Sequence, residues 1–125
     1  MAKILIIDDE SNLRETTAEL LSFAGFDVFE AQNGKEGLEK VKQIIPNIII
    51  CDVMMPTLDG YGFIEAHKQS NYAFIPVVFV TARVGEADQE KGLALGVKAY
   101  LKKPFTFKDL KLTIDNHILV DEGSC

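Results

Sequence analysis

The stretch Lys3-Ile4-Leu5-Ile6-Ile7-Asp8-Asp9-Glu10 joins an unbroken apolar run to a pair of aspartates, and this junction indicates the fold. A continuous apolar run rich in β-branched residues suits a strand that is covered on both faces, as strands of a parallel sheet are. Two similar runs occupy residues 48–51 and 77–80, and weaker strands are predicted at 27–31 and 99–101. The chain therefore holds a series of buried strands, and the first leads directly into carboxylates.

Amphipathic helices are predicted between these strands, over residues 11–24, 35–45, a segment after Gly60, 86–95 and 107–119. Gly25, Pro46 and Gly96 are suited to end three of them. Residues at helical spacing should face the core, namely Leu13, Leu20, Leu21 and Ala24, then Leu38, Val41 and Ile45, then Phe63, Ile64 and His67, and finally Leu110 and Ile114. His67 is interpreted as a partly buried packing residue. Gly37 should loosen its helix by up to ~1 kcal/mol relative to alanine.

Five strands that alternate with five helices predict an α/β fold, in which right-handed crossovers place helices on both faces of a parallel sheet. We expect a doubly wound sheet of strand order 2-1-3-4-5 in three layers. The sequence contains no internal repeat and no Ser/Pro-rich linker. One domain is therefore expected over residues 1–120, followed by a short tail at 121–125.

The composition excludes several classes of function. A formal net charge of −6 argues against direct nucleic-acid binding, which depends on lysine and arginine neutralising phosphates. No apolar run approaches the ~20 residues of a membrane helix. Cys51 should be buried and Cys125 is the last residue, so the two are not expected to pair, and a reduced, cytoplasmic location is favoured.

Polar side chains stand at the carboxyl ends of four predicted strands. Asp8 and Asp9 follow the first strand and Asp52 follows the third, while Thr81-Ala82 and Lys103-Pro104 follow the fourth and fifth. In open α/β sheets, ligands bind where the winding reverses, which here lies between the first and third strands. The three aspartates are predicted to meet at that point.

Three clustered carboxylates repel one another, and a hard divalent cation such as Mg²⁺ would relieve that repulsion. With the Lys103 ammonium also present, the site would be close to neutral and suited to phosphate. The carboxylate of Asp52 can then attack phosphorus, and the Thr81 hydroxyl can donate to a phosphoryl oxygen. A cis bond before Pro104 would fix the loop and aim Lys103. Each residue alone has an ordinary interpretation, as a turn, cap or surface residue, but their joint placement favours a phosphate site.

Four segments together resemble the receiver domains of two-component response regulators, over nearly the whole chain. They are residues 3–10, Asp52-Val53-Met54-Met55-Pro56 with Asp59-Gly60, Val80-Thr81-Ala82, and Ala99-Tyr100-Leu101-Lys102-Lys103-Pro104-Phe105. The resemblance implies a flavodoxin-like fold and a phosphorelay switch with Asp52 as the phosphoacceptor. It implies a Mg²⁺ site made by Asp9 directly, by Asp8 through water, by Asp52 and by the carbonyl of Met54. The phosphodonor would be a sensor histidine kinase or a histidine phosphotransfer protein.

The resemblance also implies a switch. Thr81 and Tyr100 match the family's switch pair, in which Thr81 moves toward the phosphoryl group and Tyr100 rotates into the space it leaves. This would reshape the surface of residues 86–119, where an unknown downstream protein, a missing output domain or a second copy in a phosphorylation-dependent dimer would dock. Met54 and Arg83, two residues beyond Asp52 and Thr81, would set the lifetime of the phosphoryl group.

Other functions are weighed against this one. An aspartate-nucleophile phosphatase of the haloacid dehalogenase type needs a second aspartate two residues after the nucleophile, where this chain has Met54. A flavodoxin-like cofactor binder needs a phosphate-cradling loop after the first strand, where this chain has acids. A receiver that only scaffolds would not need the acidic set. We therefore expect a signalling protein that takes part in its own phosphorylation and dephosphorylation, without turnover of a separate substrate.

Overall fold

The computed structural model describes residues 2–82 and 85–119, and over them five strands alternate with five helices. The elements are β1 (Lys3–Ile7), α1 (Ser11–Phe23), β2 (Asp27–Ala31), α2 (Gly34–Ile44), β3 (Ile48–Asp52), α3 (Gly60–Lys68), β4 (Val77–Thr81), α4 (Glu86–Leu95), β5 (Ala99–Lys102) and α5 (Phe107–His117). Every predicted strand and helix is present, with ends that differ from the prediction by one or two residues. The predicted tail and Arg83 lie outside the described residues.

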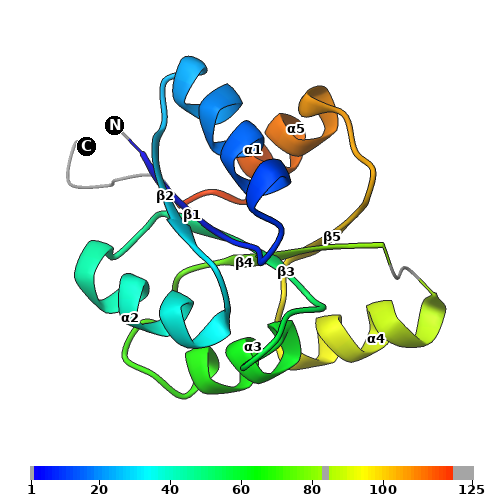
Figure 1. The fold of residues 1–125 in the computed structure, drawn as a ribbon. Coiled ribbons are helices and arrows are strands. Elements are labelled where there is room, and N and C mark those ends of the chain that lie inside the picture. Colours follow the sequence, from blue (N-terminus) through cyan, green and yellow to red (C-terminus); the bar gives the residue numbers. More distant parts are fainter. Residues whose placement is uncertain (1, 83–84, 120–125) are drawn as a thin grey trace.

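All five strands are parallel and follow the order β2-β1-β3-β4-β5. Helices α1 and α5 cover one face of the sheet, and α2, α3 and α4 cover the other (Figure 1). The predicted three-layer, flavodoxin-like doubly wound fold is therefore confirmed. Because β1 is flanked by β2 and β3, the winding reverses beside β1, which is where the aspartates were expected.

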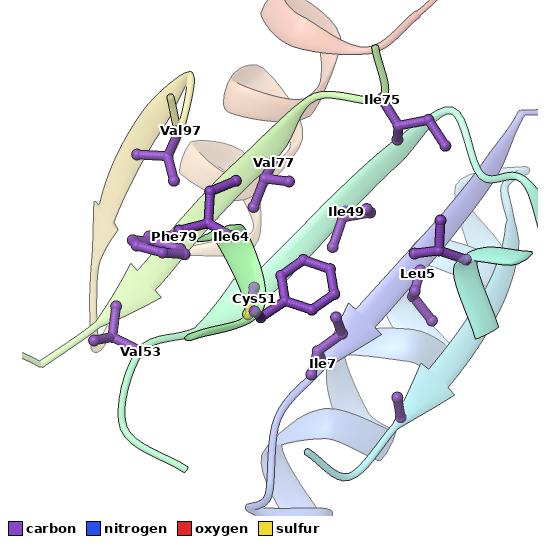
Figure 2. Close-up of a cluster of buried hydrophobic side chains, with 13 residues drawn as sticks. Leu5, Ile7, Ile49, Cys51, Val53, Ile64, Ile75, Val77, Phe79 and Val97 are labelled. Atoms are coloured by element: carbon purple, nitrogen blue, oxygen red, sulfur yellow. The ribbon is translucent and has the colours of Figure 1, made fainter. Parts of the chain in front are cut away.

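Two hydrophobic clusters hold the sheet between its helix layers. Along β1, Leu5 and Ile7 face α2 and α3, whereas Ile4 and Ile6 face α1 and α5. The first cluster combines strand residues with Phe63 and Ile64 of α3. Figure 2 shows Ile64 over the sheet, among strand residues that include Ile49 and Val77. Burial on both faces explains why the strands are apolar at successive positions, since neither face meets water.

The inner faces of α1 and α2 differ in part from the prediction. In α1 the buried residues are Thr17, Ala18 and Leu21, while Leu20 is 45% exposed. Ala24, also predicted to face the core, follows the last residue of α1 and is exposed. At roughly 100° per residue, Thr17 and Ala18 lie within about 60° of Leu21 around the helix, whereas Leu20 lies about 100° from it, at the edge of the inner face.

Ile45 is likewise exposed, because it caps α2 in the left-handed conformation, with a φ of 51°, and its side chain leaves the helix face. The predictions that the other two residues of α2 face the core are confirmed. Val41 is buried and Leu38 packs against the first cluster.

Gly37 has a packing role that its helix propensity does not reveal. A Cβ atom at this position would collide with Cδ1 of Ile7 and would lie 3.3 Å from Cε1 of Phe63. The missing side chain therefore lets α2 lie close against β1. Alanine at this position would have a higher helix propensity, but its methyl group would collide with Ile7. The glycine that loosens α2 is therefore also what allows its close contact with the sheet.

His67 is more deeply buried than predicted. Its side chain is 1% exposed, Nε2 lies 3.0 Å from the carbonyl oxygen of Ile75, and the ring stacks on Phe63. It serves as a packing residue of α3. Among the described residues, none of the helices has the length and apolar character needed to cross a membrane.

Candidate functional site: a carboxylate cluster at the ends of β1 and β3

Three carboxylates meet at the carboxyl ends of β1 and β3, as the sequence predicts. Ile7 of β1 pairs with Cys51 of β3, so the residues that follow them, Asp8 and Asp52, lie side by side. One oxygen from each of Asp8, Asp9 and Asp52 falls within a group whose members are all within 4.8 Å of one another. Asp8 and Asp52 are buried and Asp9 is exposed, so the cluster opens to solvent on the side of Asp9.

Lys103 reaches into this cluster from the β5–α5 loop. Its Nζ lies 3.0 Å from Oδ2 of Asp8 and 3.5 Å from Oδ2 of Asp52. Its backbone N–H donates to the carbonyl of Thr81 at 2.9 Å, which continues the pairing of β4 with β5 by one residue. The bond from Lys103 to Pro104 is cis, as expected, and Lys102 is exposed.

Burial and the neighbouring charges shift the pKa values of Asp52 and Lys103. Burial raises the pKa of Asp52 to about 6; the charge of Asp8 adds to the rise, and Lys103 opposes it. Burial acts to lower the pKa of Lys103, but its hydrogen bond to Asp8 and the charge of Asp52 outweigh that and raise it. At neutral pH one ammonium therefore faces three carboxylates, an excess of negative charge in a largely buried place.

The donor set fits a hard divalent cation. All three acidic ligands are oxygens, the excess negative charge calls for a cation, and exposed Asp9 gives access from solvent. Mg²⁺ prefers oxygen ligands, uses one or two carboxylates and keeps several of its waters. The part of the chain that the structure describes thus supplies what a Mg²⁺ site at this sheet end requires.

A cleft of about 450 Å³ lies over the cluster, with room for a small anionic group and for water. It is lined by Asp9, Glu10, Asp52, Met54, Thr81, Ala82 and Lys103. Thr81 is buried at its base, while Ala82 and Met54 are exposed at its rim. The predicted metal and phosphate residues therefore come together. Of the two residues predicted to set the lifetime of the phosphoryl group, Met54 is at the rim and Arg83 lies outside the described residues.

Tyr100, the predicted switch residue, does not line this cleft but lies between the sheet and α4. Its hydroxyl donates to the carbonyl of Asp88 at 2.6 Å, and its ring meets Phe79 edge to face. A Cβ atom on Gly92 would collide with the Tyr100 ring. Burial, followed by the neighbouring Tyr61 and Asp88, raises the pKa of Tyr100, so its hydroxyl keeps the proton that it donates.

The roles of Gly60 and Arg14 in shaping the site were missed at the sequence level, although Asp59-Gly60 is part of the motif quoted above. Gly60 lies directly behind Asp52, where a Cβ atom would come within 2.7 Å of the Asp52 carbonyl oxygen. Asp59 caps α3 by accepting from the Gly62 N–H, and an Asp-Gly pair at a helix start is a signal that could have indicated this close approach. Arg14 donates to the carbonyl of Asp8 at 2.8 Å. Its only sequence signal was its place in the first turn of the predicted helix, five residues after Asp9.

Comparison with known proteins agrees with this geometry. The family model described as the response regulator receiver domain matches residues 4–115. Protein PilG of Pseudomonas aeruginosa is 39% identical over 118 residues, which cover 93% of this chain and 87% of PilG. Among solved structures, the chemotaxis protein CheY4 of Vibrio cholerae superposes with a TM-score of 0.89 at 34% identity, covering 94% of this chain and 99% of that one.

Longer relatives are also found. A probable transcriptional regulator, ycf27, of Porphyridium aerugineum is 42% identical over 113 residues, which are 90% of this chain but 46% of the relative. The chain thus spans about half the length of these regulators.

Proposed function

The chain belongs to the response regulator receiver family, and from this premise we propose that Asp52 accepts a phosphoryl group in a Mg²⁺-dependent reaction. Receiver domains are signalling proteins of two-component systems. The observation that carries the proposal is the meeting of the Asp8, Asp9 and Asp52 carboxylates, with Lys103 in contact with two of them. In this proposal the receiver domain comprises residues 1–120.

The chemistry follows from the positions of these side chains. One Asp52 oxygen attacks the phosphorus of a phosphohistidine, an O–P bond forms, and the P–N bond breaks with its electron pair going to the imidazole. Phosphoryl transfer depends mainly on positioning and on stabilising charge at the transferred oxygens. The groups proposed to donate hydrogen bonds to those oxygens are the Lys103 ammonium, the Thr81 hydroxyl and the Ala82 N–H.

Receiver domains generally bind Mg²⁺ at an acidic pocket, and the residues proposed to hold it here are Asp8, Asp9, Asp52 and the carbonyl of Met54. When bound, the ion would neutralise the carboxylates and the incoming phosphoryl oxygens. Arg83 and Met54 are proposed to control how readily water reaches the phosphoryl group. The chain would thus take part in its own phosphorylation and dephosphorylation, without a separate substrate.

The proposed phosphodonor is a histidine kinase or a histidine phosphotransfer protein, and the proposed location is the cytoplasm, where such donors are charged from ATP. Tyr100 would pass the signal on by changing the surface formed by α4, β5 and α5. A partner protein, an output domain or a second copy of the chain would read that surface. Direct nucleic-acid binding by this chain is not part of the proposal, because its net charge is −6.

Incubation with acetyl phosphate tests the proposal. Intact-mass measurement should find one added phosphoryl group in the presence of Mg²⁺ and none with EDTA, and Asp52→Asn should abolish the addition. Asp59→Asn is the matched control, since asparagine keeps the oxygen that caps α3. Labelling that persisted in Asp52→Asn, or that ignored Mg²⁺, would refute the proposal.

The raised pKa of Asp52 gives an independent readout. Its folded pKa of about 6 lies above the ordinary value of 3.8, so this group favours folding below pH 3.8 and loses that contribution as the pH rises through 6. At neutral pH without Mg²⁺, Asp52→Asn should therefore raise the free energy of unfolding by on the order of 1–3 kcal/mol. Urea denaturation in EDTA measures this, and Mg²⁺ should remove the advantage by stabilising the wild type.

A further inference from the structure

Arg14 contacts the backbone of the acidic cluster from helix α1. Its Nη1 donates to the carbonyl oxygen of Asp8 at 2.8 Å, and its Nε donates to Oε1 of Glu30 in β2 at 2.9 Å. The Arg14 side chain is 13% exposed and that of Glu30 is 37% exposed, so the guanidinium is largely buried while the carboxylate that it meets reaches solvent. The rigid fork of a guanidinium group can serve two acceptors in fixed directions.

The carbonyl that Arg14 holds belongs to the peptide unit between Asp8 and Asp9. Because a peptide unit is planar, fixing its oxygen also fixes the N–H and the Cα of Asp9. The rest of Asp8 is already held, since its N–H donates to Ala31 and its carboxylate accepts from the Glu10 N–H and from Lys103. Asp9 itself is exposed. The direction in which its carboxylate leaves the chain therefore depends on that peptide plane.

We infer that Arg14 is a positioning residue, which sets the Asp8–Asp9 peptide and so aims the Asp9 carboxylate at the divalent-cation site. The inference rests on the proposed Mg²⁺ site. Glu30 supports it in two ways, because it orients the guanidinium and neutralises its charge. What Arg14 contributes is geometry, and the net charge it adds near the cation is close to zero once Glu30 is counted.

Positioning and charge make opposite predictions for the loss of Arg14. If Arg14 acted only through its positive charge, removing it would strengthen the binding of a cation nearby. If it positions Asp9, removing it would weaken cation binding, and losing such supporting contacts typically costs 10–100-fold in metal affinity. The sign of the change therefore decides between the two roles.

The experiment is a calorimetric Mg²⁺ titration of the full, unphosphorylated chain as wild type, Arg14→Gln, Arg14→Lys and Lys111→Gln. Arg14→Gln should raise the Mg²⁺ dissociation constant by about 10-fold. Arg14→Lys should raise it less, because an ammonium can keep one of the two contacts. Lys111→Gln is the control, since it also removes one positive charge and one ion pair, in α5, and should leave the constant unchanged.

Phosphorylation by acetyl phosphate at a series of Mg²⁺ concentrations gives a second readout. The Mg²⁺ concentration for half-maximal rate should rise in Arg14→Gln by the same factor as the dissociation constant, whereas the rate at saturation should fall much less. A structural defect alone would lower the saturated rate without moving the midpoint. Unfolding in EDTA checks each variant, and if Arg14→Gln does not fold, the Arg14→Lys titration decides.

The outcomes separate the two levels of inference. A wild type that binds no Mg²⁺, or that is phosphorylated without it, contradicts the proposed function itself. A wild type that binds Mg²⁺ beside Arg14 variants with unchanged or tighter binding contradicts only the positioning role.

Discussion

Helices α3 and α4 lie next to each other on one face of the sheet, but they are attached to it in different ways (Figure 1). Helix α3 buries Gly60, Phe63, Ile64 and His67, and its first turn is capped by Asp59. In α4 only Gly92 is buried, and its N-cap, Gly85, offers no side chain for capping. One helix is embedded in the core, whereas the other meets Tyr100 at Gly92 and packs against the first cluster through the partly buried Leu95.

This contrast indicates which part of the molecule can change shape. Segments with few buried apolar contacts open at a lower free-energy cost than core elements do. Helix α3 begins directly behind Asp52 and holds that strand end in place, whereas α4 can shift without dismantling the core. A rigid acidic site beside a loosely attached helix is what the proposed switch requires. Four experiments test the contrast, from the largest expected effect to the smallest.

The largest effect is expected for Phe63→Ala in α3. Phe63 is fully buried, so its truncation leaves a cavity and should lower the free energy of unfolding by about 3–5 kcal/mol. The matched change in α4 is Leu93→Ala, where the side chain is 53% exposed and the loss should stay within about 0.5 kcal/mol. Urea denaturation compares the two. Equal losses would show that α4 is as firmly held as α3.

Gly92→Ala should break the contact between α4 and Tyr100. The added methyl group would collide with the tyrosine ring, so we expect a loss of about 1–3 kcal/mol and a displaced ring, visible by NMR of labelled tyrosine. Gly85→Ala is the comparison, because among the described residues a methyl group there lies at an ordinary 3.4 Å from Asp88 Oδ2; it should weaken the N-cap of α4 and leave the tyrosine ring in place. In the double variant Gly92→Ala/Tyr100→Ala the losses should be less than additive. Strict additivity would mean that the two residues do not share this space.

His67 should make the stability of α3 depend on pH. Burial lowers its pKa, so the neutral ring favours folding above the unfolded pKa near 6.5 and that contribution is lost as the pH falls. The slope cannot exceed about 1.4 kcal/mol per pH unit for one proton. The measurement compares the pH dependence of the free energy of unfolding of Asp52→Asn with that of Asp52→Asn/His67→Gln. Asp52 is replaced in both because its carboxyl titrates near the same pH. Identical slopes between about pH 8 and pH 5 would contradict the assignment.

The smallest effect is expected for Tyr100→Phe, which removes only the hydroxyl that donates to the Asp88 carbonyl. Loss of one hydrogen bond should cost about 0.5–1.5 kcal/mol. Amide hydrogen exchange should become faster in α4 and remain unchanged in α3. Tyr72→Phe, in the segment between α3 and β4, serves as the control. Faster exchange across both helices would mean that Tyr100 supports the whole face.

The strands and the acidic cluster could be predicted from sequence because both rest on local signals. An apolar run such as Ile48-Ile49-Ile50-Cys51 identifies a buried strand because it is short, rich in β-branched residues and preceded by Pro46, and the residue after it is then placed at the sheet end. The inner face of α1 could not be settled in the same way, since Thr17 and Ala18 are buried there in preference to the larger Leu20.

Side-chain contacts between different elements were beyond the sequence, even where only a few residues separate the partners. Arg14 reads as one more charged residue on a helix, and Gly92 as a weak helix former, until the fold brings Asp8 and Tyr100 against them. The acidic set could be expected to meet because parallel strands end at one edge. The residues that support the acidic set depend on which helix face packs against which strand, and no local sequence pattern predicts that packing.

The contact between Gly37 and Ile7 implies that these two positions evolve as a pair. They share one volume, so a relative with alanine in place of Gly37 should compensate with a residue that lacks a δ-methyl group, such as valine, in place of Ile7. Covariation between the two columns would then appear in a sufficiently deep family alignment. Protein engineers could use the same rule, because Gly37→Ala combined with Ile7→Val would gain helix propensity while removing the atom with which the new methyl group collides.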